Sequence, residues 1–291
     1  MAGLISTRTA ICGVILHPAG HTRSPAMHTA AFEELGVDAR YHAFDVPPDQ
    51  LAGAIVGMRV LGIRQLAVSI PHKLTVMALV DEVEETARRI GAVNTITREG
   101  DRLVGTNSDW QGAIAALEEQ AGANLSGSRA VVLGAGGAAR AAVFGLRRQG
   151  ATVIVLNRTE AKAVDLAASL DATSTGPLEA LADLDYDILV NTTSVGLKED
   201  LSPVPPSSIR EGSIVMDAVY DPTETKLLRD AKTRGAQAVQ GKWWLVHQAA
   251  AQLEAWTHRQ APTATMAKAF DDAEEAAAAT SRRIPTSPCS L

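Results

Sequence analysis

The segment that most limits the fold of this chain runs from Val131 to Arg140 and reads VVLGAGGAAR. An apolar run that predicts a strand leads into Gly134 and Gly136, and Ala139 completes the spacing G-x-G-x-x-A before a predicted helix. In this motif the first glycine allows a tight turn, the second lets the backbone approach a pyrophosphate, and the third small residue lets the helix pack closely. The segment predicts a dinucleotide-binding α/β unit, although glycine-rich turns also serve flavin and methyl-donor sites.

The end of the next predicted strand indicates which dinucleotide is bound. The run ATVIVL is followed by Asn157, Arg158 and Thr159, and Asn157 stands 23 positions after Gly134. An NAD site usually has an acidic residue here, which binds the ribose 2′-hydroxyl. This chain has an amide, a guanidinium and a hydroxyl instead, and a guanidinium can bind a 2′-phosphate through paired charge-assisted hydrogen bonds. The alternative is that Arg158 is a solvated surface arginine; its place after a fingerprint favours NADP.

The rest of the chain alternates apolar runs with amphipathic ones, which predicts βαβ units and a mostly parallel sheet. In the first part the predicted strands are 9–16, 39–46 and 65–70, followed by a hairpin over 92–104. The predicted helices there are 25–35, 47–61, 72–80 and 82–90. Helix 111–121 leads to a second unit with predicted strands 129–133, 151–156, 187–190, 213–217 and 236–239. The chain is predicted to be helical again from 242 onward.

Charge and cysteine usage exclude several classes of protein. The net charge is −6 with no run rich in Lys or Arg, which argues against binding to nucleic acid or to an anionic membrane. Cys12 and Cys289 lie far apart, as is typical of a reducing cytoplasm. No apolar stretch is long enough to span a membrane, and the N-terminus is interpreted as a core strand rather than a signal peptide. The seven histidines lack metal-ligand spacing, so no metal is expected.

Three polar residues of the first part follow or flank predicted strands, where open α/β sheets bind ligands. Lys73 comes soon after the strand QLAVSI, Asn94 lies in AVNTI, and Asp109 ends GTNSD. Each has an ordinary structural explanation: a solvated lysine at a helix start, a hairpin cap, and an N-cap of helix 111–121. None of the three indicates a site by itself.

Taken together with the other motifs, these residues resemble the shikimate dehydrogenase family from about residue 11 to residue 270. The matching stretches of the first part are HTRSPAMH (21–28), VSIPHK (68–73), GAVNT (91–95) and GTNSD (105–109). Those of the second part are GAGGAARA, NRT, NTTSVG (191–196), DAVYDP (217–222), T-x-L-L (225–228) and GKWWLVHQA (241–249). Their order and spacing are those of the family.

The resemblance implies a fold and a reaction. The fold is α/β with two domains: residues 1–110 and 242–280 form the catalytic, substrate-binding domain, to which the C-terminal helices return. Residues 111–241 form a Rossmann-type NADP-binding domain, and 281–291 are expected to be a disordered tail. The reaction is a reversible hydride transfer between shikimate and 3-dehydroshikimate, with Lys73 and Asp109 as the acid/base pair. A lysine suits this role because its protonated form can donate to a developing alkoxide.

By the same resemblance, the substrate-binding residues are Thr22, Ser24, Ser69, Asn94, Tyr220 and Gln248. The cofactor-binding residues are Gly134, Ala135, Gly136, Gly137, Ala138, Asn157, Arg158, Thr159, Asn191, Thr192 and Gly241. Neither a metal nor a covalent intermediate is implied, because the nicotinamide carries the redox chemistry. The expected partners are a small cyclic hydroxy acid and, at most, a second copy of the chain.

The chain departs from the family pattern at several positions. Thr22 replaces the first Ser of the usual S-x-S, and the middle residue, Arg23, is charged rather than apolar. Ala67 replaces the Asn of the usual N-V-T, and Trp244 replaces a Met. The alternative substrates are therefore quinate, an aminoshikimate or another cyclic hydroxy acid. A non-catalytic ligand sensor is a further alternative, because one fold can serve several functions.

Overall fold

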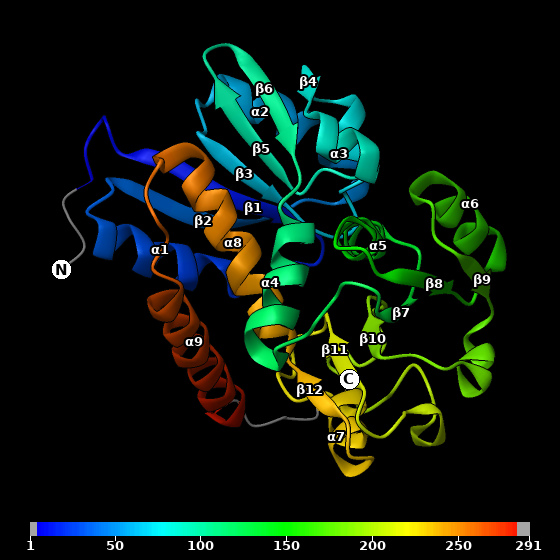
Figure 1. Ribbon diagram of the computed structural model, residues 1–291. Coiled ribbons are helices and arrows are strands. Elements are labelled where there is room, and N and C mark those ends of the chain that lie inside the picture. Colours follow the sequence, from blue (N-terminus) through cyan, green and yellow to red (C-terminus); the bar gives the residue numbers. More distant parts are fainter. Residues whose placement is uncertain (1–4, 284–291) are drawn as a thin grey trace, which may run out of the picture.

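The computed structural model describes residues 5–283, which form two six-stranded sheets with helices packed against them. Figure 1 shows the two sheets side by side, with helices α4 (Asp109–Ala121) and α8 (Gly241–Thr257) between them. No helix in the described part of the chain is long and apolar enough to cross a membrane. The architecture is the α/β class predicted from the sequence.

The first sheet is mixed and has the order β2-β1-β3-β5-β6-β4. Strands β1, β2 and β3 are parallel, β5 is antiparallel to both β3 and β6, and β4 pairs in parallel with β6. The strands are β1 Ala10–Leu16, β2 Ala39–Asp45, β3 Gln65–Val68, β4 Glu82–Val83, β5 Thr95–Glu99 and β6 Arg102–Thr106. The helices of this part are α1 Ser24–Leu35, α2 Leu51–Val60 and α3 Glu85–Ile90, with short 3₁₀ turns at Pro48–Gln50 and Thr75–Ala78.

Two helices expected from the sequence are different in the structure. Segment 72–80 consists of turns and the 3₁₀ helix Thr75–Ala78, because the backbone carbonyl of Lys73 accepts from Val93 N at 2.8 Å rather than from a helical neighbour. Segment 82–90 begins with the strand Glu82–Val83, and only α3 is helical. The backbone of Asp81 pairs with Leu103 just before this strand, so tertiary pairing overrides the helical pattern.

The second sheet is entirely parallel, with the order β12-β11-β10-β7-β8-β9. Its strands are β7 Arg129–Leu133, β8 Thr152–Leu156, β9 Ser174–Gly176, β10 Ile188–Asn191, β11 Ile214–Asp217 and β12 Gln237–Val239. The helices are α5 Gly137–Arg148, α6 Glu160–Leu170 and α7 Lys226–Thr233, with 3₁₀ helices at Leu178–Asp183 and Pro206–Ser208. The order reverses between β7 and β10, which makes a doubly wound sheet whose ligand crevice lies at that switch point. Strand β9 was not predicted, because the sequence STG has no apolar run.

Strand β7 is apolar at every position after Arg129, and the packing of the sheet explains why. Ala130 and Val132 belong to the apolar cluster that also contains α4 and α5 residues, whereas Val131 and Leu133 belong to the cluster under α7. Successive side chains of a strand point to opposite faces. A parallel strand covered on both faces therefore needs an uninterrupted apolar run, which the four residues AVVL after Arg129 supply.

Helices α4 and α8 touch almost backbone to backbone. A Cβ atom on Gly112 would lie 2.8 Å from both the backbone nitrogen of Gln248 and the carbonyl oxygen of Trp244. Helix α8 then leads into α9 (Thr263–Arg283), which packs beside α1 next to the first sheet. The helices after 242 thus return to the first sheet. Helix α9 extends three residues into segment 281–291, and residues 284–291 of that expected tail lie outside the described residues.

Candidate active site

The mixed pairing of the first sheet gathers the polar residues singled out from the sequence. Strand β3 ends at Val68, and its Ala67 lies opposite Thr95, so the start of β5 meets the end of β3. In the hairpin, Thr95 lies opposite Thr106, so the end of β6 reaches the same edge. The segments that carry Lys73, Asn94 and Asp109 therefore converge, although they are separated in sequence.

Lys73 and Asp109 form an ion pair, with Lys73 Nζ 2.6 Å from Asp109 Oδ2. Their side chains are 15% and 6% exposed, so the pair is largely shielded from solvent while keeping access to the cavity that it lines. Asp109 is the first residue of α4, and its backbone N–H donates to Asn107 Oδ1 at 2.9 Å. A shielded ion pair whose aspartate is held in place can hold or move one proton without competition from bulk water.

Asn94 orients the aspartate from behind. Its amide nitrogen donates to Asp109 Oδ1 and to Ser108 Oγ, both at 3.0 Å, and lies 3.3 Å from Gln248 Oε1. Its side-chain oxygen, Oδ1, accepts from the backbone N–H of Ser108 at 2.9 Å. Asn94 is buried and does not line the cavity, so its contact is with the aspartate rather than with the open space.

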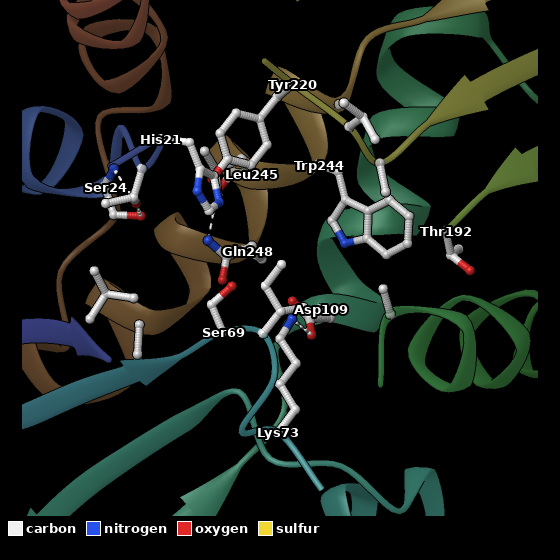
Figure 2. Close-up of a pocket in the computed structure, with 18 of the residues that line it drawn as sticks. His21, Ser24, Ser69, Lys73, Asp109, Thr192, Tyr220, Trp244, Leu245 and Gln248 are labelled. Atoms are coloured by element: carbon white, nitrogen blue, oxygen red, sulfur yellow. Dashed lines mark hydrogen bonds and ion pairs between the residues drawn. The ribbon is translucent and has the colours of Figure 1, made fainter. Parts of the chain in front are cut away.

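One cavity between the two sheets contains most of the expected site residues. Figure 2 shows Lys73 and Asp109 on its wall, with Ser24, His21 and Tyr220 toward one side and Trp244 and Thr192 toward the other. The expected substrate residues that line it are Thr22, Ser24, Ser69, Tyr220 and Gln248. Burial raises the pKa of Tyr220 to about 12, so its phenol stays a hydrogen-bond donor across the physiological range.

Several residues to which the motifs assigned no binding role also line the cavity, and three of them have side chains that can contact a ligand. His21 precedes Thr22 and is 6% exposed. Gln252 lies one helical turn after Gln248, and this i, i+4 spacing on α8 is a signal that the sequence offered. Trp244 is buried on the same helix, and Figure 2 shows its indole between Asp109 and Thr192.

The glycine turn after β7 has the geometry of a phosphate cradle. Gly134 has φ +114°, and a Cβ atom there would lie 2.6 Å from Thr192 Oγ1, so only glycine fits. Gly136 is exposed, with open space where a side chain would stand, and it precedes α5 without any side-chain cap. Uncapped N–H groups at a helix start bind anions. The residues present therefore fit a pyrophosphate.

The same turn lies against Lys73 of the ion pair. A Cβ atom on Gly137 would stand 3.1 Å from the Cβ of Lys73, so the start of α5 touches the lysine stem. Ala138, Thr192 and Gly241 line the cavity that contains the ion pair. Gly241 has no room for a side chain, because a Cβ atom would lie 2.6 Å from the carbonyl oxygens of Asp217 and Val219. The cradle and the ion pair therefore belong to one site.

The segment Asn157–Thr159 lies beside this turn at the carboxyl edge of the sheet. The backbone N–H of Gly134 donates to Leu156 O at 2.8 Å, which puts Asn157 next to the glycine turn. Asn157 Nδ2 donates to the carbonyl oxygen of Thr159 at 2.8 Å, and Arg158 is exposed. An exposed guanidinium beside the cradle can reach a phosphate there.

Asn191, which was expected to bind the cofactor, does not line the cavity. Its side chain is fully buried and donates to Asp217 Oδ1 at 2.8 Å, while its own oxygen accepts from Thr193. The structure therefore puts Thr192 and Thr193, rather than the Asn191 amide, on the cavity wall. Burial raises the pKa of Asp217 to about 6, against three hydrogen bonds that stabilise its charged form.

Within the described residues, no group of three or more His, Cys, Asp or Glu side chains could hold a metal ion. A doubly wound sheet whose phosphate cradle opens onto a lysine–aspartate pair is the arrangement of a dinucleotide-dependent oxidoreductase.

Comparison with models of known families shows which family of oxidoreductases the chain resembles. Residues 14–96 match the shikimate dehydrogenase substrate binding domain, 116–198 match shikimate / quinate 5-dehydrogenase, and 245–269 match the shikimate 5′-dehydrogenase C-terminal domain. The chain belongs to the shikimate dehydrogenase family.

Individual relatives agree along nearly the whole chain. The shikimate dehydrogenase (NADP⁺) of Haloarcula marismortui is 46% identical over 258 residues, which cover 88% of this chain and 96% of the relative. The crystal structure of shikimate 5-dehydrogenase from Thermus thermophilus in complex with NADP(H) and shikimate superposes with a TM-score of 0.85. It has 38% identity, and the match covers 91% of this chain and 99% of that one. The 5-ketofructose reductase of a Gluconobacter strain is also similar, with a TM-score of 0.81, 32% identity and coverage of 92% and 100%.

Proposed function

We propose that the protein catalyses the reversible, NADP-dependent transfer of a hydride between shikimate and 3-dehydroshikimate. The observation that carries this proposal is the ion pair of Lys73 and Asp109, 2.6 Å long, in the cavity that the glycine turn opens onto. Relatives of high coverage are named shikimate dehydrogenase (NADP⁺), which supports the same reaction and cofactor.

NADP, when bound, supplies the nicotinamide that accepts or returns the hydride. The protein has to manage the proton of the reacting hydroxyl, and Lys73 Nζ is the group for that role. Asp109 holds the lysine in place through one carboxylate oxygen, while Asn94 fixes the other oxygen at 3.0 Å. Proton transfer by a positioned side chain contributes typically about 10²- to 10⁴-fold to the rate.

Hydroxyl and amide groups of the cavity wall hold the substrate in this proposal. Thr22, Ser24 and Tyr220 offer hydroxyls at one side of the cavity, where a carboxylate can accept several hydrogen bonds. Ser69 and Gln248 face the space next to the ion pair and suit ring hydroxyls. The substrate is thereby oriented with its reacting hydroxyl at Lys73.

The cofactor is held at the carboxyl edge of the second sheet. The residues assigned to it are Gly134, Ala135, Gly136, Gly137, Ala138, Asn157, Arg158, Thr159, Thr192 and Gly241, with Asn191 supporting the loop behind Thr192. Arg158 is assigned to the 2′-phosphate, because no carboxylate follows β8 in the segment Asn157–Thr159.

We place the two domain boundaries near the start of α4 and the start of α8, where the chain passes from one sheet to the other. Residues 1–110 and 242–280 form the substrate-binding domain, and 111–241 form the NADP-binding domain. The enzyme acts in the cytoplasm as a monomer or homodimer on a small cyclic hydroxy acid. Its net charge of −6 opposes association with nucleic acid phosphates.

A second candidate is an enzyme of the same family with another cyclic substrate, such as quinate or an aminoshikimate. Ala67 lines the cavity with a methyl group where the family has an amide, and Trp244 occupies the side near Thr192. A lost amide removes a hydrogen-bond partner for one ring substituent, which shifts preference rather than abolishing chemistry. The similarity to 5-ketofructose reductase supports substrate variation on this fold.

The test is the initial rate of reduced-cofactor formation with shikimate and with quinate, each with NADP and with NAD. Fast turnover of shikimate with NADP, reduced about 10²- to 10⁴-fold in Lys73→Ala, supports the main proposal. Turnover of quinate alone supports the second candidate. Thermal stabilisation by shikimate without any turnover indicates a ligand sensor and contradicts both.

A further inference from the structure

His21 stands in the cavity without a role in the hydride transfer described above. The residue is 6% exposed, and its ring centroid lies 6.0 Å from that of Tyr220. Figure 2 shows the imidazole pointing into the cavity between Ser24 and Tyr220, above Gln248. A buried imidazole aimed into a binding cavity is placed to contact the ligand.

The groups that line the cavity near this ring are the hydroxyls of Thr22, Ser24 and Tyr220 and the Gln248 amide, which carry no charge. Arg23 and Lys198, whose charges act on the ring, do not line the cavity. Thr22 Oγ1 lies 3.3 Å from Ser24 Oγ, and Tyr220 is hydrogen-bonded to Thr22. These hydroxyls can donate to a carboxylate but leave its charge uncompensated in a partly buried place. Burying an unpaired charge is costly, so a cation beside the carboxylate is expected to form.

Burial and the nearby charges lower the pKa of the His21 ring when no acid is bound, which favours its neutral form. Burial, followed by the positive charge of Lys198, lowers the pKa of His21 below its ordinary value, and Arg23 acts in the same direction. Asp221 and the carbonyl of Pro18 oppose this lowering without cancelling it. Tyr220 stays neutral, and Gln248 of α8 is not titratable. A bound carboxylate adds a negative charge to this balance and favours the protonated ring.

We propose that the His21 imidazole binds the substrate carboxylate and takes up a proton when that carboxylate binds. The inference rests on the proposed function, because it requires a ring acid with its carboxylate at the Thr22, Ser24 and Tyr220 side. The direction of the pH dependence follows because proton binding and acid binding are linked. Between the pKa of the free ring and the higher pKa in the complex, binding consumes a proton, so the Kd of the acid increases as pH rises.

The experiment is isothermal titration calorimetry of the full-length protein with shikimate, near pH 7, in buffers of different ionisation enthalpy. The dependence of the heat on the buffer gives the number of protons taken up. The variants are His21→Gln, which keeps a hydrogen-bonding side chain but cannot titrate, and Lys73→Met, which removes another ionisable group of the site. His42→Gln makes the same change at an exposed histidine of β2 and serves as the matched control.

We expect proton uptake in the wild type, His42→Gln and Lys73→Met, and none in His21→Gln. Over the linked window, the Kd of shikimate should rise by up to about tenfold per pH unit in the wild type and stay flat in His21→Gln. Binding without proton uptake, or equal uptake in His21→Gln, overturns the inference and leaves the proposed function standing. No binding of shikimate or quinate by the wild type overturns the proposed function and the inference together.

Discussion

Asp217 and Asn191 are joined by a buried hydrogen bond, with Asn191 Nδ2 2.8 Å from Asp217 Oδ1. The second oxygen of Asp217 accepts from Thr225 Oγ1 at 2.7 Å, and the backbone N–H of Val219 adds a bond of 3.0 Å. One carboxylate thus connects the end of β10, the end of β11 and the start of α7. The loops that it ties together carry Thr192 and Tyr220 of the cavity wall.

Asp217→Ala should destabilise the protein and weaken cofactor binding at the same time. The change leaves the buried Thr225 hydroxyl without its acceptor, at a cost of about 1–3 kcal/mol. The Asn191 amide keeps only its long contact of 3.4 Å with Val195 O. Urea unfolding measures the first effect, and quenching of tryptophan fluorescence by NADP measures the second. Asp217→Asn keeps an acceptor for Asn191 and should lose less of both. Equal losses in the two variants would contradict the role given to the carboxylate.

Arg158→Ala should raise the KM for NADP about 10- to 100-fold, the range expected for one or two charge-assisted hydrogen bonds. The KM for NAD should change little, because NAD has no 2′-phosphate for the guanidinium to bind. Steady-state kinetics with the two cofactors makes the comparison. A similar increase for both would show that Arg158 does not select the 2′-phosphate. The exposed Arg234, at the end of α7, can be changed to Ala as a control.

Gly112→Ala should destabilise the protein by about 1–3 kcal/mol, because a methyl group there overlaps the backbone of α8 at 2.8 Å. Gly57→Ala is the matched control: this glycine lies within α2, and open space surrounds its Cβ position. Alanine at that position should stabilise the helix by about 0.5–1 kcal/mol. Unfolding in urea at one pH gives both values. Opposite signs for the two variants support the α4–α8 contact, and two stabilising changes would contradict it.

His28 makes the stability depend on pH. The imidazole is fully buried, its ring nitrogens have no hydrogen-bond partner among the described residues, and burial lowers its pKa to about 3. The ring stacks on Tyr41 with ring centroids 4.1 Å apart. A histidine with a lowered pKa in the folded state contributes its full stability above the unfolded value of 6.5, and this stability is lost as pH falls toward 3.

His28→Phe keeps an aromatic ring at this place and removes the titration. As pH falls below 6.5, the variant should gain stability over the wild type by up to about 1.4 kcal/mol per pH unit. The free energy of unfolding at about pH 7.5, 6 and 5 gives the slope. His42→Gln, on the exposed face of β2, should follow the wild-type curve. Parallel curves for His28→Phe and wild type would exclude His28 as the source of the acid sensitivity.

The sequence by itself determined the features that rest on short, local patterns. The strand and glycine turn around Gly134 follow from an apolar run and from residues without side chains, whose effect needs no distant partner. Lys73 and Asp109 could be singled out because ligands bind at the ends of strands, and the family resemblance paired them. The two-sheet α/β class follows from the alternation of strand and helix patterns.

Tertiary structure decided what depends on residues far apart in the chain. Segment 72–80 is not a helix, because the carbonyl of Lys73 is bonded to Val93, and β4 forms only because β6 offers an edge. Asn94 and Asn191 are buried behind the cavity wall rather than on it, whereas His21 and Gln252 lie on it. Side-chain direction and burial are set by the packing of whole elements against one another, and local sequence carries little of that information.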